Sequence, residues 1–417
     1  METLKGKKLL GINGLGRIGK LTLWYHLQSR YFEGAVVNVG REVGKNLEDL
    51  IRTIDTDSTY GSLSRFLYGM TGKTCDIHII DADKGMIEID GFPVTILRKE
   101  RNPKNIGWHK EGVKVVVDCT GKFLDPTVPA DDPKGSLRGH LDAGARKVIA
   151  SAPFKIKDSA KPEPSDSPTL IYGINHLSFM PREHHIISAA SCTTTGLAHM
   201  MKPLLDDEET ARILTASMST VHAATNTQSV LDAVPSTGAS DLRKNRSVMN
   251  NIILSTTGAG KALEKVLPQI SQIGLMADSV RIPTSTVSLI TLNITFHSRM
   301  NEFGEPAINK AHLDNLYQKA AEGSQKGLLF FSQRQNVSSD MIGLRAAVVV
   351  EGHETHTRTG LLQIPSSLLE AYGLKSDNHL SIPVTHAKLF GWYDNEFGSY
   401  VYCLGKLTEY IEGTLAS

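Results

Sequence analysis

The sequence predicts an α/β protein built from two different parts: a doubly wound parallel sheet, and an α+β part with a mainly antiparallel sheet. Strand-like apolar runs alternate with amphipathic helical stretches over residues 1–120, which is typical of a parallel sheet. After about residue 190, long runs with period-two alternation appear, as expected for antiparallel strands with one covered face. We therefore expect one domain over residues 1–190, completed by a C-terminal helix at 396–417, and a second over residues 191–395.

Length and composition limit the class of protein. A chain of 417 residues is too long for one ordinary domain of ~150 residues, and 40% hydrophobic with 21% charged residues is typical of a globular protein. A formal net charge of +1 argues against nucleic-acid binding as the main function. Four cysteines are too few for a disulfide scaffold. No apolar run approaches the ~20 residues that span a bilayer, and the N-terminal apolar stretch is too short for a signal peptide, so we expect a cytoplasmic protein.

The elements of the first part are expected to be short and closely spaced, and those of the second part longer. Residues 113–117 form a continuous apolar run, as expected for a strand buried on both faces. Four prolines within residues 151–168 predict a loop. The remaining expected elements are, in chain order, a strand at 9–12, a helix at 20–30, a strand at 35–39, a helix at 47–54, and strands at 212–222 and 287–296.

A glycine-rich turn, GLGRIG at 14–19, follows the first strand and opens the first helix. Gly14 allows a tight turn, Gly16 lets the backbone approach a pyrophosphate, and Gly19 lets the helix pack closely on the strand. The helix N-terminus offers free N–H groups to the anion. Because strand and helix supply the context that this motif requires, we predict a Rossmann-type dinucleotide site here.

The end of the second strand leaves the choice of dinucleotide open. An acidic residue about 20 positions after the glycines should bond the adenine ribose 2′-hydroxyl of NAD. The strand is instead followed by Gly40 and Arg41, with Glu42 just beyond. Arg41 could accept the 2′-phosphate of NADP or could point into solvent, so both NAD and NADP are candidate cofactors.

Cys192 is a candidate nucleophile, because it precedes a helix-like apolar stretch. The segment SCTTTG at 191–196 offers threonines as capping residues. Cys192 is therefore expected at a helix N-terminus, where the dipole and free N–H groups favour a thiolate. The same N–H groups can hold an oxyanion formed when the sulfur attacks a carbonyl. The alternative is a small buried residue without chemical function.

His222 is the candidate partner of this cysteine, near the end of the alternating strand at 212–222. A cysteine nucleophile needs a nearby base or cation, and a strand end facing a helix N-terminus could supply one. Taken alone, one of 15 histidines is more often a structural residue. The adjacent pair His184 and His185 lacks a third ligand nearby, so we expect it at the surface, and we expect no metal site.

Eight segments together resemble phosphorylating glyceraldehyde-3-phosphate dehydrogenase in their order and approximate spacing. The resemblance covers most of the chain, and it is specific because the cysteine segment and the WYDNE segment rarely occur together elsewhere. The segments are GINGLGRIGK at 11–20, DSTYG at 57–61, CTGKF at 119–123, SCTTT at 191–195, STVHAATNTQ at 219–228, STTGAGK at 255–261, RIPTSTVS at 281–288 and WYDNEFG at 392–398.

The resemblance implies a reaction and the residues that carry it. Cys192 matches the family's nucleophile and His222 its base. The thiolate would attack the aldehyde of D-glyceraldehyde 3-phosphate, hydride would pass to NAD or NADP, and inorganic phosphate would release 1,3-bisphosphoglycerate from the Cys192 thioester. Thr225 and Arg281 look like ligands of the substrate phosphate, since a guanidinium can fork two hydrogen bonds to phosphate oxygens. The other phosphate-binding residues implied are Ser191, Thr193, Arg246, Thr257 and Gly258.

The resemblance also implies cofactor contacts and an assembly. Asn395 matches the asparagine that orients the nicotinamide carboxamide. A homotetramer acting in glycolysis is implied, with the loop at 235–250 near a neighbouring subunit's cofactor. The cofactor-binding residues implied are Asn13, Gly14, Gly16, Arg17, Ile18, Arg41, Thr120, Gly121 and Asn395.

Two other functions stay open at this point. A relative acting on a longer sugar phosphate, such as erythrose 4-phosphate, would use the same Cys192–His222 pair without inorganic phosphate; Thr193, Thr257 and Gly258 favour the phosphorylating enzyme. A catalytically idle protein that binds RNA at the dinucleotide cleft is disfavoured by the near-zero net charge and by the intact cysteine–histidine pair. The chain is longer than is usual for the family, and we place the additional segments at 125–139, 154–169 and 345–389.

Overall fold

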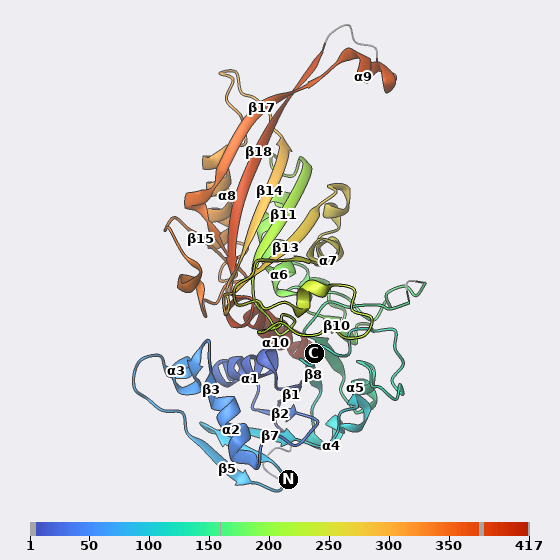
Figure 1. Cartoon of the computed structure of the whole chain (residues 1–417), viewed down its shortest axis with the longest axis vertical. Coiled ribbons are helices and arrows are strands. Elements are labelled where there is room, and N and C mark those ends of the chain that lie inside the picture. The colour runs from blue at the N-terminus through green and yellow to red at the C-terminus, as the bar shows by residue number, and fades with distance from the viewer. Residues whose placement is uncertain (1–5, 159, 375–378, 416–417) are drawn as a thin grey trace. The chain divides into compact units, whose positions relative to one another are not determined.

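A computed structural model describes residues 6–158, 160–374 and 379–415 (Figure 1). The chain divides into two compact units. The first unit comprises Met1–Cys192 together with Glu396–Ser417, and the second comprises Thr193–Asn395. None of the described helices is both long enough and apolar enough to cross a lipid bilayer.

The first unit holds an eight-stranded sheet in the order β10–β9–β8–β1–β2–β7–β6–β5. The strands from β10 to β7 pair in parallel, whereas β6 and β5 are antiparallel. The strand order reverses at β1, and ligands of such sheets bind outside the carboxyl ends of the strands at this point. The strands are β1 (Leu9–Asn13), β2 (Gly34–Asn38), β5 (Ile77–Asp81), β6 (Met86–Ile89), β7 (Phe92–Leu97), β8 (Val115–Asp118), β9 (Lys147–Ala150) and β10 (Ile186–Ser188); β3 (Thr56–Asp57) and β4 (Gly61–Ser62) form a separate pair.

Alternate residues of the central strands enter two different cores. Leu10 and Ile12 of β1 pack into one core with Trp24 of α1, whereas Leu9 packs into another with Trp108 of α4. All residues of β1 and β8 are buried as a result, and the predicted doubly wound architecture is confirmed. The helices are α1 (Arg17–Ser29), α2 (Leu47–Asp55), α3 (Leu63–Tyr68), α4 (Trp108–Glu111), α5 (Gly139–Asp142) and α10 (Tyr402–Gly413), the last preceded by a π-helical turn, Phe397–Val401.

The second unit is built on a mixed sheet in the order β12–β13–β11–β14–β18–β16–β15, with β17 also paired to β18. Most pairings are antiparallel; β11–β13 and β15–β16 are parallel. Burial alternates along the whole of β14, as a sheet with one covered face requires. The strands are β11 (Ile213–Ala223), β12 (Ile253–Thr256), β13 (Met276–Ile282), β14 (Ser288–His297), β15 (Leu329–Ser332), β16 (Val348–Glu351), β17 (His356–Ile364) and β18 (Leu380–Tyr393).

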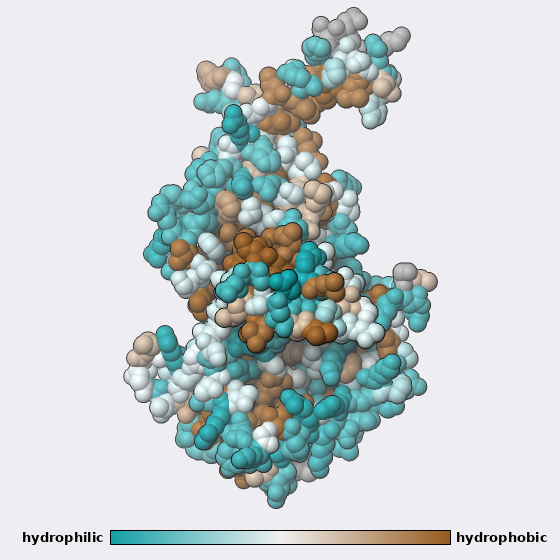
Figure 2. Space-filling view, viewed as in Figure 1, coloured by the Kyte–Doolittle hydropathy of each residue, from teal (hydrophilic) through white to brown (hydrophobic). Residues whose placement is uncertain are grey.

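Strands β17 and β18 form a long antiparallel hairpin in the second unit. Figure 1 shows the hairpin of β17 and β18 extending past the other strands of its sheet, with α9 close to its end. Figure 2 shows hydrophobic side chains on this extension. Leu361 and Leu362 of β17 and Leu368 of α9 are exposed. This segment falls within residues 345–389, one of the three additional segments expected. The helices are α6 (Cys192–Asp206), α7 (Ala259–Val266), α8 (Lys310–Glu322) and α9 (Ser366–Ala371).

The expectation that His184 and His185 lie at the surface is wrong for His184. Its side chain is buried, and its Nδ1 accepts a hydrogen bond from the Met180 N–H at 3.0 Å. His185 is half-buried and its Nδ1 lies 3.3 Å from Lys147 Nζ. The two histidines are polar partners of the turn before β10, which the sequence pattern alone did not indicate.

Candidate active site

Cys192 is the first residue of α6, as predicted, but the threonines at 193–195, expected as capping residues, lie inside the helix. The Cys192 side chain is half-buried, whereas those of Thr193 and Thr195 are buried in the helix. The first turn of a helix has unsatisfied N–H groups and a positive partial charge, both of which stabilise a thiolate or an adjacent oxyanion. The position therefore suits a nucleophilic sulfur.

The other three cysteines have environments that suppress the thiolate. Burial raises the pKa of Cys119 and of Cys403 to about 12. Burial, followed by a hydrogen bond to Asp90, raises the pKa of Cys75 to about 12. Because the thiolate is the reactive form, these residues are poor nucleophiles at neutral pH, and Cys192 is the candidate that remains.

His222 lies next to last in β11, and the parallel register of β11 with β13 places it opposite Arg281. His222 Nδ1 is 2.8 Å from the Ala223 carbonyl oxygen and 2.5 Å from Arg281 Nη1. Burial, and then the charge of Arg281, lower the pKa of His222 to about 3. Nδ1 thus lies between the Ala223 oxygen, which can only accept, and the Arg281 guanidinium, which can only donate.

Tyr393, at the end of β18, connects the start of α6 with the end of β11. Its hydroxyl lies 2.9 Å from Thr193 Oγ1 and 2.7 Å from Thr220 Oγ1. Its ring packs edge-on against the His222 ring, with 6.0 Å between the centroids. The residue that follows Cys192 and the imidazole of His222 are thus held by one buried side chain. Tyr393 was not among the predicted site residues, although the WYDNEFG segment that contains it was a signal.

The residues predicted to bind phosphate occupy two separate places. Arg281 pairs with Ile253 at one end of β12, whereas Thr257 and Gly258 follow the other end and begin α7. Thr225 is held by its hydroxyl, which donates to Gln228 Oε1 at 3.1 Å. Two anions would have two distinct positions in this arrangement.

Arg246 and Ser191 differ in how the structure places them. Arg246 is exposed, and its Nε donates to Asp232 at 3.0 Å. It lies just after the short helical turn Leu242–Asn245 rather than on the main sheet. Ser191 is half-buried and directly precedes α6.

The carboxyl end of β1 has the backbone geometry that the glycine motif predicts. Gly14 has φ +95°, and its N–H donates to Asn38 O at 2.8 Å. A Cβ at Gly19 would lie 1.9 Å from Gly14 O, so helix and turn can approach only with glycine there. A Cβ at Gly16 would meet no described atom within 4 Å, which leaves the N-terminus of α1 open to an anion. These residues fit a dinucleotide pyrophosphate.

A buried polar network supports this edge of the sheet. Trp108 Nε1 donates to His140 Nδ1 at 2.9 Å, and His140 Nε2 lies 3.1 Å from Asp118 Oδ2. Asn13 Nδ2 also donates to Asp118 Oδ2, at 2.7 Å. The other Asp118 oxygen accepts from the N–H and the hydroxyl of Thr120, at 3.0 and 2.6 Å. The network fixes Asn13 and Thr120, two predicted cofactor-binding residues, and Gly121 follows with φ +63°; the roles of Asp118, His140 and Trp108 were missed.

Arg17 is held by carboxylates of its own unit. Its Nε donates to Glu396 at 3.0 Å, and its terminal nitrogens bond Glu396 and Asp57. Lys20 completes this cluster, with its Nζ 2.8 Å from Asp57. Ile18 is half-buried against the first core. Arg17 therefore shapes the start of α1 through fixed ion pairs.

Asn395 is buried in the second unit with its side-chain oxygen engaged. Asn395 Oδ1 accepts from the Ser288 hydroxyl at 3.2 Å and from that of Thr286 at 3.5 Å. These contacts set the direction of the amide and leave Nδ2 as its donor end. No group of three or more metal-ligating His, Cys, Asp or Glu side chains occurs in the described part of the chain.

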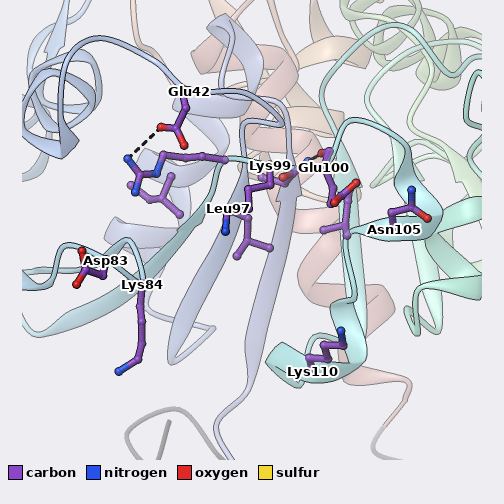
Figure 3. A pocket seen from close by; sticks show the side chains of 12 residues that line it. Glu42, Asp83, Lys84, Leu97, Lys99, Glu100, Asn105 and Lys110 are labelled. Carbon is purple, nitrogen blue, oxygen red and sulfur yellow. Dashed lines mark hydrogen bonds and ion pairs between the residues drawn. The ribbon is translucent and has the colours of Figure 1, made fainter.

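A cavity of about 360 Å³ lies beside the carboxyl ends of β2 and β7 (Figure 3). Glu42 lies at one end of it in an ion pair with Arg98, at 3.2 Å, and Lys110 of α4 lies at the other. Arg41, at the same end of β2, is exposed. The charged side chains that line the cavity are Glu42, Asp83, Lys84, Arg98, Lys99, Glu100 and Lys110.

Comparison with known proteins identifies relatives over nearly the whole chain. Residues 8–126 match the family described as glyceraldehyde 3-phosphate dehydrogenase, NAD binding domain, and residues 191–366 match its C-terminal domain. Glyceraldehyde-3-phosphate dehydrogenase of Bacteroides fragilis is 32% identical over 93% of this chain and 95% of the relative. That of Geobacillus stearothermophilus is 31% identical over 96% and 97%, and glyceraldehyde-3-phosphate dehydrogenase 1 of Saccharomyces cerevisiae 32% over 96% and 98%.

Proposed function

Because the chain belongs to the glyceraldehyde-3-phosphate dehydrogenase family, we propose that it oxidises D-glyceraldehyde 3-phosphate with inorganic phosphate, giving 1,3-bisphosphoglycerate. It is an oxidoreductase with a nicotinamide-dinucleotide-binding domain. The observation that carries the proposal is the link through Tyr393 between the start of α6, where Cys192 lies, and the strand end that presents His222 and Arg281.

The proposed first step is attack of the Cys192 sulfur on the aldehyde carbon. A C–S bond forms, the carbonyl π bond breaks, and the N–H groups of the first turn of α6 hold the developing oxyanion. The oxyanion takes up the proton of the Cys192 thiol, and His222 removes this proton again as the thioester forms, since burial, and then the charge of Arg281, keep the ring neutral at physiological pH. A bound nicotinamide dinucleotide supplies the hydride acceptor.

The proposed second step transfers the acyl group to inorganic phosphate. A phosphate oxygen attacks the thioester carbon, the C–S bond breaks, and the Cys192 thiolate leaves. Thr257 and Gly258, at the start of α7, supply a hydroxyl and N–H groups for this phosphate. Arg281 and Thr225 bind the phosphate of the substrate, because a guanidinium beside a hydroxyl suits a dianion.

Initial rates of nicotinamide reduction test the reaction. The purified chain should reduce the cofactor with glyceraldehyde 3-phosphate only when inorganic phosphate is present, and C192S should abolish this activity. C403S is the matched control, because Cys403 is buried in α10 with a raised pKa. Phosphate-independent reduction, or reduction only with erythrose 4-phosphate, would contradict the proposal and favour the longer sugar phosphate. Activity retained in C192S would show that the reaction does not pass through a Cys192 thioester.

We further propose that the chain acts in the cytoplasm as a homotetramer. The segment from Val230 to Ile252 exposes several large apolar side chains, which is unusual for a surface that faces only water. They are Val230, Leu231, Val234, Leu242, Met249 and Ile252. Sedimentation velocity should give a tetramer at micromolar concentration; a monomer under these conditions would contradict the assembly without affecting the proposed chemistry.

A further inference from the structure

The end of β2 lacks the carboxylate that NAD-binding sheets of this kind place there. Beyond Asn38, the Val39 N–H still donates to Leu97 O at 2.8 Å, so the pairing of β2 with β7 continues to the residue before Gly40. Gly40 has φ +69°, and a Cβ there would lie 2.9 Å from Glu100 O. An aspartate or glutamate at this position would meet both backbone strain and a clash. The position that should bond the ribose 2′-hydroxyl is therefore occupied by bare backbone.

The nearest carboxylate in the sequence is already engaged. Glu42 forms an ion pair with Arg98 at 3.2 Å, beside the cavity of Figure 3. Glu100 follows β7 and offers its backbone oxygen to Asn38 Nδ2 at 3.0 Å, while its side chain lines that cavity together with Lys99. Four cationic side chains against three carboxylates line this cavity, so its formal charge is positive.

Two guanidinium groups flank Gly40. Arg101 packs its side-chain stem on Gly40, with Cγ 3.3 Å from the Cβ position, and its Nε donates to Gly40 O at 3.1 Å. The two terminal nitrogens of Arg101 make no hydrogen bond or ion pair with any described residue. Arg41 follows Gly40 directly, is exposed, and likewise has no such contact among the described residues. Arg101 is thus anchored through one nitrogen while its planar fork stays open.

We propose that Arg41 and Arg101 bind the 2′-phosphate of NADP and that the chain prefers NADP to NAD. The inference rests on the proposed dinucleotide-dependent function and concerns the adenosine end of the same site. A phosphate oxygen pair suits the fork of Arg101, and Arg41 adds a second charge. Gly40, which cannot present an acid, removes the repulsion that a carboxylate would exert on this phosphate. NAD keeps its ribose hydroxyls but lacks a carboxylate acceptor at the Gly40 position.

The test uses adenosine fragments, because these carry neither nicotinamide nor substrate. Calorimetry should show 2′,5′-ADP binding to the full chain about ten- to hundredfold more tightly than 5′-AMP, the range that charge-assisted hydrogen bonds give. R41Q and R101Q should each remove about tenfold of this preference, and the double variant should bind both fragments equally. R182Q is the control, since Arg182 is exposed and precedes β10, at the opposite edge of the same sheet.

Three results would overturn the proposal: equal binding of the two fragments by the unaltered chain, an unchanged preference in R41Q/R101Q, or an equal loss in R182Q. Thermal unfolding of R41Q and R182Q should match that of the unaltered chain, because both arginines are exposed, whereas R101Q should lose only the stability of the hydrogen bond from Arg101 Nε to Gly40 O. The outcome does not depend on the substrate. A chain that prefers 2′,5′-ADP but fails to oxidise glyceraldehyde 3-phosphate would refute the proposed reaction and keep the NADP site.

Discussion

Helix α1 in the first unit and strand β11 in the second each bury a histidine whose pKa lies at about 3. Burial alone lowers the pKa of His26. Its ring stands edge-on to those of Tyr25 and Phe32, and neither ring nitrogen has a hydrogen-bond partner in the described part of the chain. His222 also has burial as its first cause, but Arg281 adds a charge, and Ala223 O fixes the ring.

The two histidines show that a lowered pKa does not by itself indicate a functional residue. A histidine inside an apolar core stays neutral because no charge can be solvated there. His222 stays neutral beside the positive charge of Arg281. An anion bound at this place would stabilise that charge. The neighbours of the histidine, rather than the size of its shift, therefore point to a site that receives phosphate.

The largest expected difference between the two histidines is in the effect of their substitution on kcat. H222N should lower kcat by ~10²–10⁴-fold, because the proton of the hemithioacetal loses its acceptor. H26F should leave kcat within about twofold, since His26 contacts only its own core. Steady-state kinetics at pH 7.5 measures both. Equal losses in the two variants would mean that His222, like His26, serves packing alone.

Arg281 is the difference between the two histidines, and its removal should leave burial as the main cause of the low pKa of His222, as it is for His26. R281M should reduce kcat/KM by about ten- to hundredfold through loss of phosphate binding. Because burial is the first cause of the low pKa of His222 and the charge of Arg281 the second, that pKa should rise only part of the way toward 6.5. The base must be deprotonated, so the acid limb of the kcat/KM profile should move to higher pH. R281K, which keeps the charge, should leave the limb in place.

The sequence predicted those parts of both units that local geometry dictates. GLGRIG at 14–19 could be interpreted because a tight turn, a close approach and a packed helix each demand glycine. Cys192 could be placed at a helix start because the helix pattern follows it directly. These features depend on neighbours in the sequence, and the structure reproduces them.

Contacts between distant segments could not be predicted in this way. The network of Trp108, His140 and Asp118 exists because β8 and the short helices α4 and α5 meet beside the end of β1. Nothing in the spacing of those residues differs from that of ordinary core positions. The Tyr393 bridge depends on the register of β18 and β14 with β11, which a one-residue slip would destroy. The family resemblance marked Tyr393's segment without indicating its partners.

His26 should instead control stability in acid. The unfolded chain binds a proton below about pH 6.5, whereas the folded chain does not do so until about pH 3. Stability that is complete above pH 6.5 is therefore lost progressively as the pH falls through this window, by about 2 kcal/mol between pH 7 and pH 5. H26F should remove this loss of about 2 kcal/mol in the free energy of unfolding. Urea titrations at pH 7 and pH 5 measure it. A pH dependence unchanged by H26F would mean that the buried ring is protonated in the folded state.

The smallest effect concerns the bridge that distinguishes the His222 region from the His26 region. Y393F keeps the ring against His222 but leaves the hydroxyls of Thr193 and Thr220 without their shared partner. Stability should fall by about 1 kcal/mol, the net value of a typical hydrogen bond.

The matched control is Y317F, because Tyr317 is buried in α8 and its hydroxyl donates to Met200 O at 2.9 Å. Both variants should lose similar stability. Only Y393F should also slow kcat and the alkylation of Cys192, each by about fivefold with KM unchanged, since ~1 kcal/mol corresponds to that factor. If Y317F slows them equally, the loss reflects packing in the second unit, and Tyr393 does not position the nucleophile.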